Sequence, residues 1–184
     1  MKGNRAIVTA VVVVLVLVLG WYLLRRSGSA GSVDLLTQFD QATKAPASES
    51  FPIVDATLGN ETKKAIAPPG LAGTRIIWKV RVPDDGWLRV NLGLKPDAWQ
   101  KPGDGVLFKV IVSDGKASDE LFTQHVDPFN NAADRRWIPV MVDLSAYGGE
   151  QVDLIFNTYA SPPKVPGNMD NDMPLWGTPE IVIR

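Results

Sequence analysis

The sequence contains no cysteine among its 184 residues. This absence excludes disulfide bonds, thiolate nucleophiles and cysteine-ligated metal sites. Histidine is nearly absent as well, because His125 is the only one. A catalytic triad would need His125 beside an activated serine, but the chain has no nucleophile-elbow pattern and no second histidine. We therefore interpret His125 as a structural or surface residue, and an enzymatic function is not favoured.

An excess of positive charge is also lacking. Four of the 19 basic side chains lie before Val33, whereas all 20 acidic side chains lie after it. The formal net charge of the whole chain is −1, so the part after Val33 carries about −5. Nucleic acid requires a basic surface that neutralises its phosphates. We therefore set nucleic-acid binding aside.

Residues 6–24 contain no charged side chain. As a helix this run would be about 28 Å long, which matches the hydrocarbon core of a bilayer. Basic residues flank both ends, and Trp21 and Tyr22 lie at the second end, where aromatic rings favour the headgroup region. The run predicts a transmembrane helix within an anchor of residues 1–26. The alternative is a signal peptide cut after Ala30, but its apolar core is usually only about 7–15 residues.

The orientation of this helix is not decided by charge, because two basic residues lie on each side of it. A short N-terminal tail is easily retained inside the cell. We therefore expect a single-pass protein of a bacterial inner membrane, with a cytoplasmic N-terminus and a periplasmic or otherwise extracytoplasmic C-terminal domain.

Residues 27–50 are mostly small and polar, which is typical of a linker. One apolar patch interrupts them, formed by Leu35, Leu36 and Phe39. The patch is either a helical turn that docks on the following domain or on a neighbour, or an isolated trio within the linker.

Residues 137–157 predict the centre of a β-domain. Ile138, Val140 and Val142 recur at every second position, and the alternation resumes at Val152 after a turn that contains Gly148 and Gly149. A period of two is the pattern of half-buried strands. The segment therefore reads as a strand, a tight corner and a second strand.

Six further segments of this kind give about eight strands in residues 51–184. Residues 75–82 and 87–94 predict a hairpin around a Pro-Asp-Asp-Gly turn, and residues 106–112 and 120–126 predict another around Ser-Asp-Gly-Lys. Shorter strands are predicted at residues 51–57 and 180–184. Because 14 prolines and 16 glycines are scattered between these runs, we expect a mainly β domain, an eight-stranded antiparallel jelly-roll sandwich.

Several segments of this domain resemble a known family. They are residues 105–110 (GVLFKV), 134–137 (DRRW), 142–149 (VDLSAYGG) and 175–181 (LWGTPEI), together with Asp172. In this succession the chain is similar to galactose-binding-like β-sandwiches of the carbohydrate-binding-module type, found in bacterial envelope proteins. The resemblance implies the fold of residues 51–184. For function it implies a sugar-binding or protein-binding module, because members of this fold differ in their ligands.

Three aromatic residues in predicted loops are candidate ligand-binding residues: Trp99, Phe129 and Tyr159. A sugar site uses such rings as platforms and polar side chains for the hydroxyl groups. The polar candidates are Arg135, Asn168 and Asp170. Loop aromatics are equally suited to anchor a protein interface, and most of the six tryptophans are expected in the core.

Residues 168–172, Asn-Met-Asp-Asn-Asp, are the densest group of oxygen ligands. Calcium prefers six to eight such oxygens, so Asp170 and Asp172 are candidate ligands of a structural calcium ion. The alternative is a turn in which Asp172 accepts backbone hydrogen bonds. No other cofactor is expected.

Two functions follow from these observations. The first is a non-catalytic accessory or stabilising subunit of a larger membrane protein complex, respiratory or photosynthetic, held by bilayer contacts of residues 6–24 and by other membrane subunits. The alternative is a membrane-tethered carbohydrate-binding module that recognises envelope glycans.

Overall fold

A computed structural model describes residues 31–71, 73–160 and 171–184 of the chain. The predicted transmembrane helix of residues 6–24 lies outside the described residues. Within the described ranges, no helix has the length and apolar character needed to cross a bilayer. The compact unit extends from Ser32 to Arg184, so it begins earlier than the domain start expected at Phe51.

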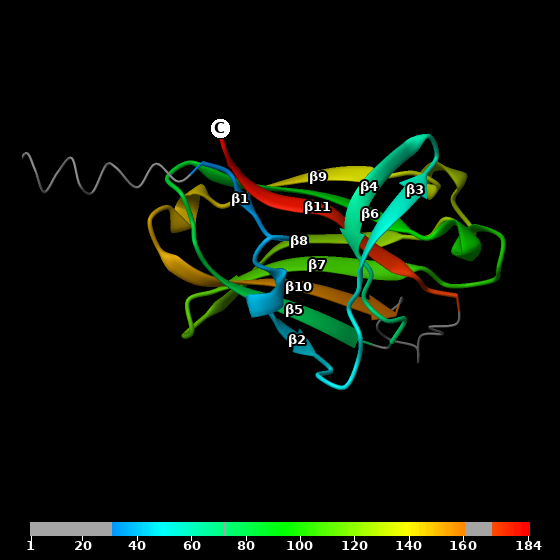
Figure 1. Ribbon diagram of the computed structural model, residues 1–184, viewed down its shortest axis with the longest axis horizontal. Coiled ribbons are helices and arrows are strands. Elements are labelled where there is room, and N and C mark those ends of the chain that lie inside the picture. Colours follow the sequence, from blue (N-terminus) through cyan, green and yellow to red (C-terminus); the bar gives the residue numbers. More distant parts are fainter. Residues whose placement is uncertain (1–30, 72, 161–170) are drawn as a thin grey trace, which may run out of the picture. The chain divides into compact units, whose positions relative to one another are not determined.

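The described residues form eleven strands and four short 3-10 helices (Figure 1). The strands are β1 (Val33–Asp34), β2 (Thr43–Ala45), β3 (Ile53–Leu58), β4 (Glu61–Ile66), β5 (Gly73–Arg81), β6 (Gly86–Leu94), β7 (Val106–Ser113), β8 (Ser118–Val126), β9 (Ile138–Asp143), β10 (Gln151–Ala160) and β11 (Pro174–Ile183). The 3-10 helices are η1 (Phe39–Gln41), η2 (Pro96–Trp99), η3 (Ala132–Asp134) and η4 (Ser145–Tyr147). The prediction of eight strands missed β1, β2 and β4. The first two are too short to show alternation, and β4 begins with four polar residues.

The strands form two antiparallel sheets that pack face to face. The six-stranded sheet has the order β3-β4-β11-β6-β9, and β1 also pairs with β11. The five-stranded sheet has the order β2-β5-β10-β7-β8. The mainly β, two-sheet part of the fold prediction is therefore confirmed, and β9 and β10 with η4 between them form the predicted strand, corner and strand.

The predicted hairpin of residues 75–82 and 87–94 is wrong, because its two strands belong to different sheets. Strand β5 pairs with β2 and β10, whereas β6 pairs with β11 and β9. The turn itself is present, and Gly86 N–H donates to the Pro83 carbonyl at 3.0 Å. A tight turn reverses the chain equally well within one sheet and between two, so the turn residues do not distinguish these cases.

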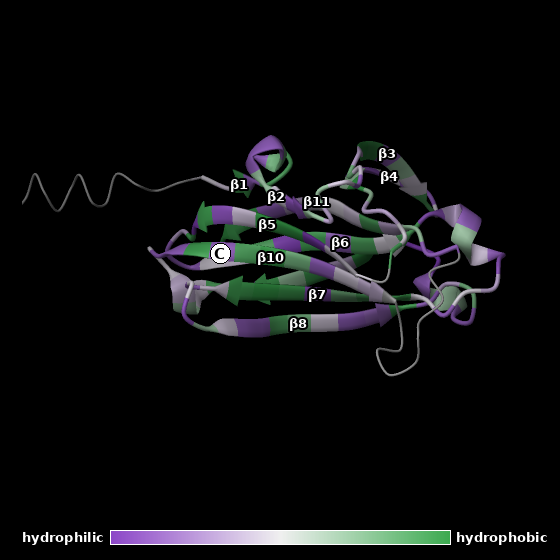
Figure 2. Cartoon of the chain, turned by 90° about the horizontal axis from the view of Figure 1, so that it is seen from below, coloured by the Kyte–Doolittle hydropathy of each residue, from purple (hydrophilic) through white to green (hydrophobic). Residues whose placement is uncertain are grey.

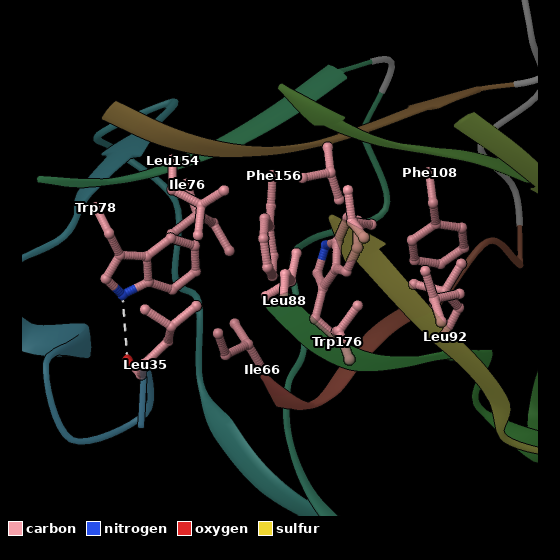
Figure 3. Close-up of a cluster of buried hydrophobic side chains, with 14 of the residues drawn as sticks. Leu35, Ile66, Ile76, Trp78, Leu88, Leu92, Phe108, Leu154, Phe156 and Trp176 are labelled. Atoms are coloured by element: carbon pink, nitrogen blue, oxygen red, sulfur yellow. Dashed lines mark hydrogen bonds between the residues drawn. The ribbon is translucent and has the colours of Figure 1, made fainter. Parts of the chain in front are cut away.

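A row of aromatic rings crosses the core between the sheets (Figure 3). The Trp78 ring centroid lies 6.2 Å from that of Phe39 and 4.9 Å from that of Phe156. Trp176 continues the row at 4.4 Å from Phe156 and 4.9 Å from Phe108. Such tilted and edge-on pairs add to the stabilisation that area burial provides. Trp78 and Trp176 are therefore core residues.

The segment predicted as a linker contributes to this core. Leu35 is fully buried and Phe39 is 4% exposed. Strands β1 and β2 on either side of η1 pair with β11 and β5. For the apolar patch, the structure therefore selects docking on the sandwich over an isolated trio within a linker.

A second, smaller cluster lies on the other side of the six-stranded sheet, under the β3–β4 hairpin. Its centre is Trp137, whose indole N–H donates to the Glu61 carbonyl at 3.0 Å. The ring rests on Gly177, where an added Cβ would come within 2.8 Å of the ring carbon Cζ3. The absence of a side chain at Gly177 therefore makes room for the indole.

Candidate functional site

The outer face of the five-stranded sheet presents a set of polar and aromatic side chains. Along β10 the residues Asp153, Ile155, Asn157 and Tyr159 alternate with the core residues, so they share this face. Figure 2 shows β5, β10, β7 and β8 side by side, with hydrophobic and hydrophilic segments alternating along the strands. The central position of β10 places Tyr159 and Asn157 between two neighbouring strands.

Three side chains on this face form one hydrogen-bonded chain. Arg75 Nε donates to Asn157 Oδ1 at 3.2 Å, and Asn157 Nδ2 donates to the Tyr159 hydroxyl at 2.9 Å. Arg75 and Asn157 are direct cross-strand partners. Because Asn157 is only 1% exposed and uses both ends of its amide, it holds Arg75 and Tyr159 in fixed positions.

The Tyr159 ring lies over its cross-strand partner Gly73. A Cβ atom at Gly73 would lie 3.4 Å from the ring carbon Cδ1, which is ordinary contact distance. The ring therefore lies close to the backbone of β5.

These residues line a pocket of about 300 Å³ at the edge formed by β2, β5 and β10. The lining residues come from three places: Ala45 and Pro46 from the end of β2 and the residue after it, Gly73, Thr74 and Arg75 from β5, and Asn157 and Tyr159 from β10. The lining thus combines an aromatic ring, an amide and a guanidinium group. This is the combination that binds a polar molecule with an apolar face.

The sheet beneath the pocket is fixed by a buried pair of threonines. The Thr74 and Thr158 hydroxyl groups are hydrogen-bonded to each other on the core side of β5 and β10. Thr158 is fully buried and Thr74 is 4% exposed. The pair satisfies two hydroxyl groups that would otherwise be buried without a partner in an apolar region.

The structure places three of the predicted ligand-binding residues together, apart from this pocket. Arg135 Nε donates to the Pro128 carbonyl at 2.8 Å, and its Nη2 lies 3.4 Å from the Trp99 carbonyl and 3.5 Å from the Phe129 carbonyl. The Trp99 ring is half-buried, and its N–H donates to the Leu94 carbonyl at 2.9 Å. Of the three, Phe129 alone presents an exposed aromatic ring, at 38% exposure.

The remaining predicted residues fall in or next to the undescribed range 161–170. Asn168 and Asp170 lie outside the described residues. Asp172 is 4% exposed and lies on the wall of a separate pocket of about 380 Å³ with Lys95 and Glu49. In the ranges that the structure describes, no three His, Cys, Asp or Glu side chains are grouped to hold a metal ion.

His125 contacts the loop before β7 and is not among the residues that line the pocket of Tyr159 and Asn157. Its Nε2 lies 2.8 Å from the Asp104 carbonyl oxygen. The neighbouring Gly105 has a φ of +78°, where an added Cβ would lie only 2.6 Å from the imidazole Nε2. The interpretation of His125 as a structural or surface residue agrees with this geometry.

Sequence reasoning found Tyr159 but missed Arg75, Asn157 and Gly73. Tyr159 was expected in a loop, whereas it belongs to β10. The missing information was the pairing of β10 with β5, because these strands are about 80 residues apart in the chain. The alternation of residues 75–82 showed a strand with one outer face, although it did not show which strand pairs with it.

Comparison with known sequences finds a relative that matches part of the chain. No family model matches the chain. An uncharacterised protein of Archaeoglobus fulgidus is 36% identical over 106 residues, which cover 56% of this chain. The match spans 25% of that protein, so the two are similar over about a quarter of the relative's length.

Comparison with solved structures identifies the fold. TmCBM61 in complex with β-1,4-galactotriose is similar with a TM-score of 0.53 and 10% identity, over 79% of this chain and 90% of that one. The CBM51-2 and INT domains of Clostridium perfringens ZmpB give a TM-score of 0.52 and 18% identity, over 77% of this chain and 29% of that one. The tandem CBM51 modules of Sp3GH98, the family 98 glycoside hydrolase of Streptococcus pneumoniae, give a TM-score of 0.51 and 13% identity. This match covers 86% of this chain and 48% of that one.

These neighbours correct the first expectation about function. An accessory subunit of a membrane protein complex is wrong as the main interpretation, because TmCBM61 and the CBM51 modules, which share this architecture, are carbohydrate-binding modules. The finding favours the alternative that the sequence offered. At these identities the similarity establishes the fold. The chain has the galactose-binding-like β-sandwich fold of carbohydrate-binding modules.

Proposed function

We propose that this protein is a non-catalytic carbohydrate-binding module whose glycan site is the pocket of Tyr159, Asn157 and Arg75. The observation that carries the proposal is the hydrogen-bonded chain from Arg75 through Asn157 to the Tyr159 hydroxyl. It holds an aromatic ring and a multiple hydrogen-bond donor beside one pocket. The shared fold with carbohydrate-binding modules supports this choice over other ligands.

Each group has a separate role in binding a sugar. The Tyr159 ring offers an apolar face to the C–H groups of a pyranose, while Arg75 donates hydrogen bonds to its hydroxyl oxygens. The buried Asn157 amide orients both groups before the sugar arrives, which reduces the entropy lost on binding. The pocket is open to solvent, so a chain of sugars can extend beyond it.

The proposal includes a location. Residues 6–24 predict a membrane anchor, and we propose that the domain lies on its extracytoplasmic side. A module tethered in this way would meet glycans of the cell envelope. This is the alternative function that the sequence predicted, a membrane-tethered carbohydrate-binding module.

Binding to immobilised glycans tests the proposal. Full-length protein in a mild detergent is applied to an array of neutral and charged polysaccharides that includes β-1,4-galactan and xylan. We expect Tyr159→Ala to reduce binding at least tenfold, because it removes the platform. Phe129→Ala is the matched control, since it removes an exposed ring outside the pocket.

Two outcomes would contradict the proposal. Binding lost in Phe129→Ala and kept in Tyr159→Ala would place the sugar site at the cluster of Trp99, Phe129 and Arg135. Absence of binding to any glycan by the folded full-length protein would refute glycan recognition itself.

A further inference from the structure

The charges around the pocket indicate the class of glycan. Among the described residues that line it, Arg75 is the one cation and there is no carboxylate. This composition contrasts with the chain after Val33, which has an excess of acidic side chains. The pocket is therefore a basic position on an acidic domain.

Two lysines on the same face are paired with carboxylates. Lys79 Nζ lies 2.8 Å from Asp153 Oδ1, and Lys109 Nζ lies 2.6 Å from Glu120 Oε2. Arg75 differs from these lysines, because among the described residues it forms no ion pair and its hydrogen-bond partner is the neutral amide of Asn157. The positive charge of Arg75 is thus available to a ligand.

The geometry of Arg75 suits a carboxylate. Its Nε is used by Asn157 Oδ1, so the two terminal nitrogens remain for a bidentate contact with two oxygens. Tyr159 faces Gly73 across the strands, and Arg75 is two residues further along β5. Such diagonal neighbours have separations of about 7–8 Å. One sugar ring on Tyr159, with a carboxylate at its edge, can span this distance.

We propose, on the basis of the proposed function, that this site recognises glycans that contain hexuronic acid. The tyrosine binds the ring face and the guanidinium group binds the carboxylate of the same sugar. A neutral sugar would leave Arg75 with hydroxyl groups alone and would lose the charge-assisted part of the interaction.

The test compares one polymer with and without its charge. Affinity electrophoresis measures the retardation of the full-length protein by polygalacturonate and by fully methyl-esterified polygalacturonate, in detergent and EDTA so that calcium bridges are absent. We expect at least tenfold weaker binding to the esterified polymer. Binding to polygalacturonate should weaken as NaCl is raised from 50 to 500 mM, because salt screens the charge contribution.

Two variants assign this effect to Arg75. Arg75→Gln should reduce binding to polygalacturonate at least tenfold and leave binding to the esterified polymer within twofold. Arg81→Gln is the matched control, since Arg81 is an exposed arginine on the same face and strand but outside the pocket. It should leave both affinities unchanged.

The possible failures are distinguishable. Equal binding to the two polymers, or to neutral glycans in preference, with no effect of Arg75→Gln, would overturn the uronate assignment and leave the proposed function standing. Failure to bind any polysaccharide would refute both. Equal losses in Arg75→Gln and Arg81→Gln would show non-specific charge attraction and would also overturn the assignment.

Discussion

The indole N–H of Trp78 donates a hydrogen bond to the backbone carbonyl of Leu35 at 3.1 Å. Trp78 lies in the five-stranded sheet, whereas Leu35 directly follows β1, which is an edge strand of the other sheet. The Leu35 side chain is itself fully buried in the same core. This contact joins the N-terminal segment to the centre of the sandwich (Figure 3). Residues 33–45 are therefore part of the domain.

Replacing Leu35 by alanine tests this conclusion. We expect the free energy of unfolding to fall by about 2–5 kcal/mol, because the substitution leaves a cavity beside Trp78. Urea unfolding followed by tryptophan fluorescence measures the change. Asp40→Ala is the control, since Asp40 is exposed in the same segment and should change stability by less than about 0.5 kcal/mol. A linker without tertiary contacts would show no loss in either variant.

The sequence predicted the strands whose two faces differ strongly and missed those that depend on distant partners. Residues 75–82 alternate clearly because one face meets the core and the other meets solvent. Strand β4 has buried residues only at Ala65 and Ile66, where it pairs with β11. Its first four positions carry polar side chains, so it lacked a periodic signal.

The difference between local signals and distant partners also explains which residues of the candidate site could be predicted. An aromatic residue in a predicted loop is visible in the sequence, and Tyr159 was identified in this way, although it belongs to β10. Its partners Arg75 and Gly73 depend on the register between β5 and β10, which a single sequence does not give. Arg135 was identified as a polar ligand, but its guanidinium group binds three backbone carbonyls of its own loops.

Gly177 should tolerate alanine poorly. A methyl group there would approach the Trp137 ring to 2.8 Å, and the ring is held by the hydrogen bond from its indole N–H to the Glu61 carbonyl. We expect Gly177→Ala to reduce the free energy of unfolding by about 1–3 kcal/mol, as overpacking in a core does. Chemical denaturation measures the loss. In a double-mutant cycle with Trp137→Leu, the alanine should be less destabilising, and an unchanged loss would exclude this clash as its cause.

The buried threonine pair under the pocket should show strong coupling. Thr74→Val alone leaves the Thr158 hydroxyl buried without its partner, so we expect a loss of about 1–3 kcal/mol in the free energy of unfolding. Thr158→Val should behave in the same way. The double variant replaces both groups by apolar ones of the same shape and should be less destabilised than the two single losses together. Strict additivity in urea denaturation would contradict a direct interaction.

Tyr147 should make the fold sensitive to alkaline pH. Burial, followed by the hydrogen bond that its hydroxyl donates to Asp119 Oδ2 at 2.8 Å, raises the pKa of Tyr147 from 10.0 to about 12. In the unfolded chain this tyrosine loses its proton near pH 10, whereas the folded protein retains it to about pH 12. The contribution of Tyr147 to stability is therefore complete below pH 10 and declines as the pH rises toward 12.

Urea denaturation at intervals from pH 9 to 12 measures this decline. Tyr147→Phe has no ionisable group, so its free energy of unfolding should fall less steeply between pH 10 and 12 than that of the unsubstituted protein. Asp119→Asn serves as a second variant, because it removes the acceptor charge while the ring remains. It should lower the pKa of Tyr147 and make the decline shallower, since the folded and unfolded pKa values then lie closer together. Parallel curves for all three proteins would show that Tyr147 does not link folding to pH.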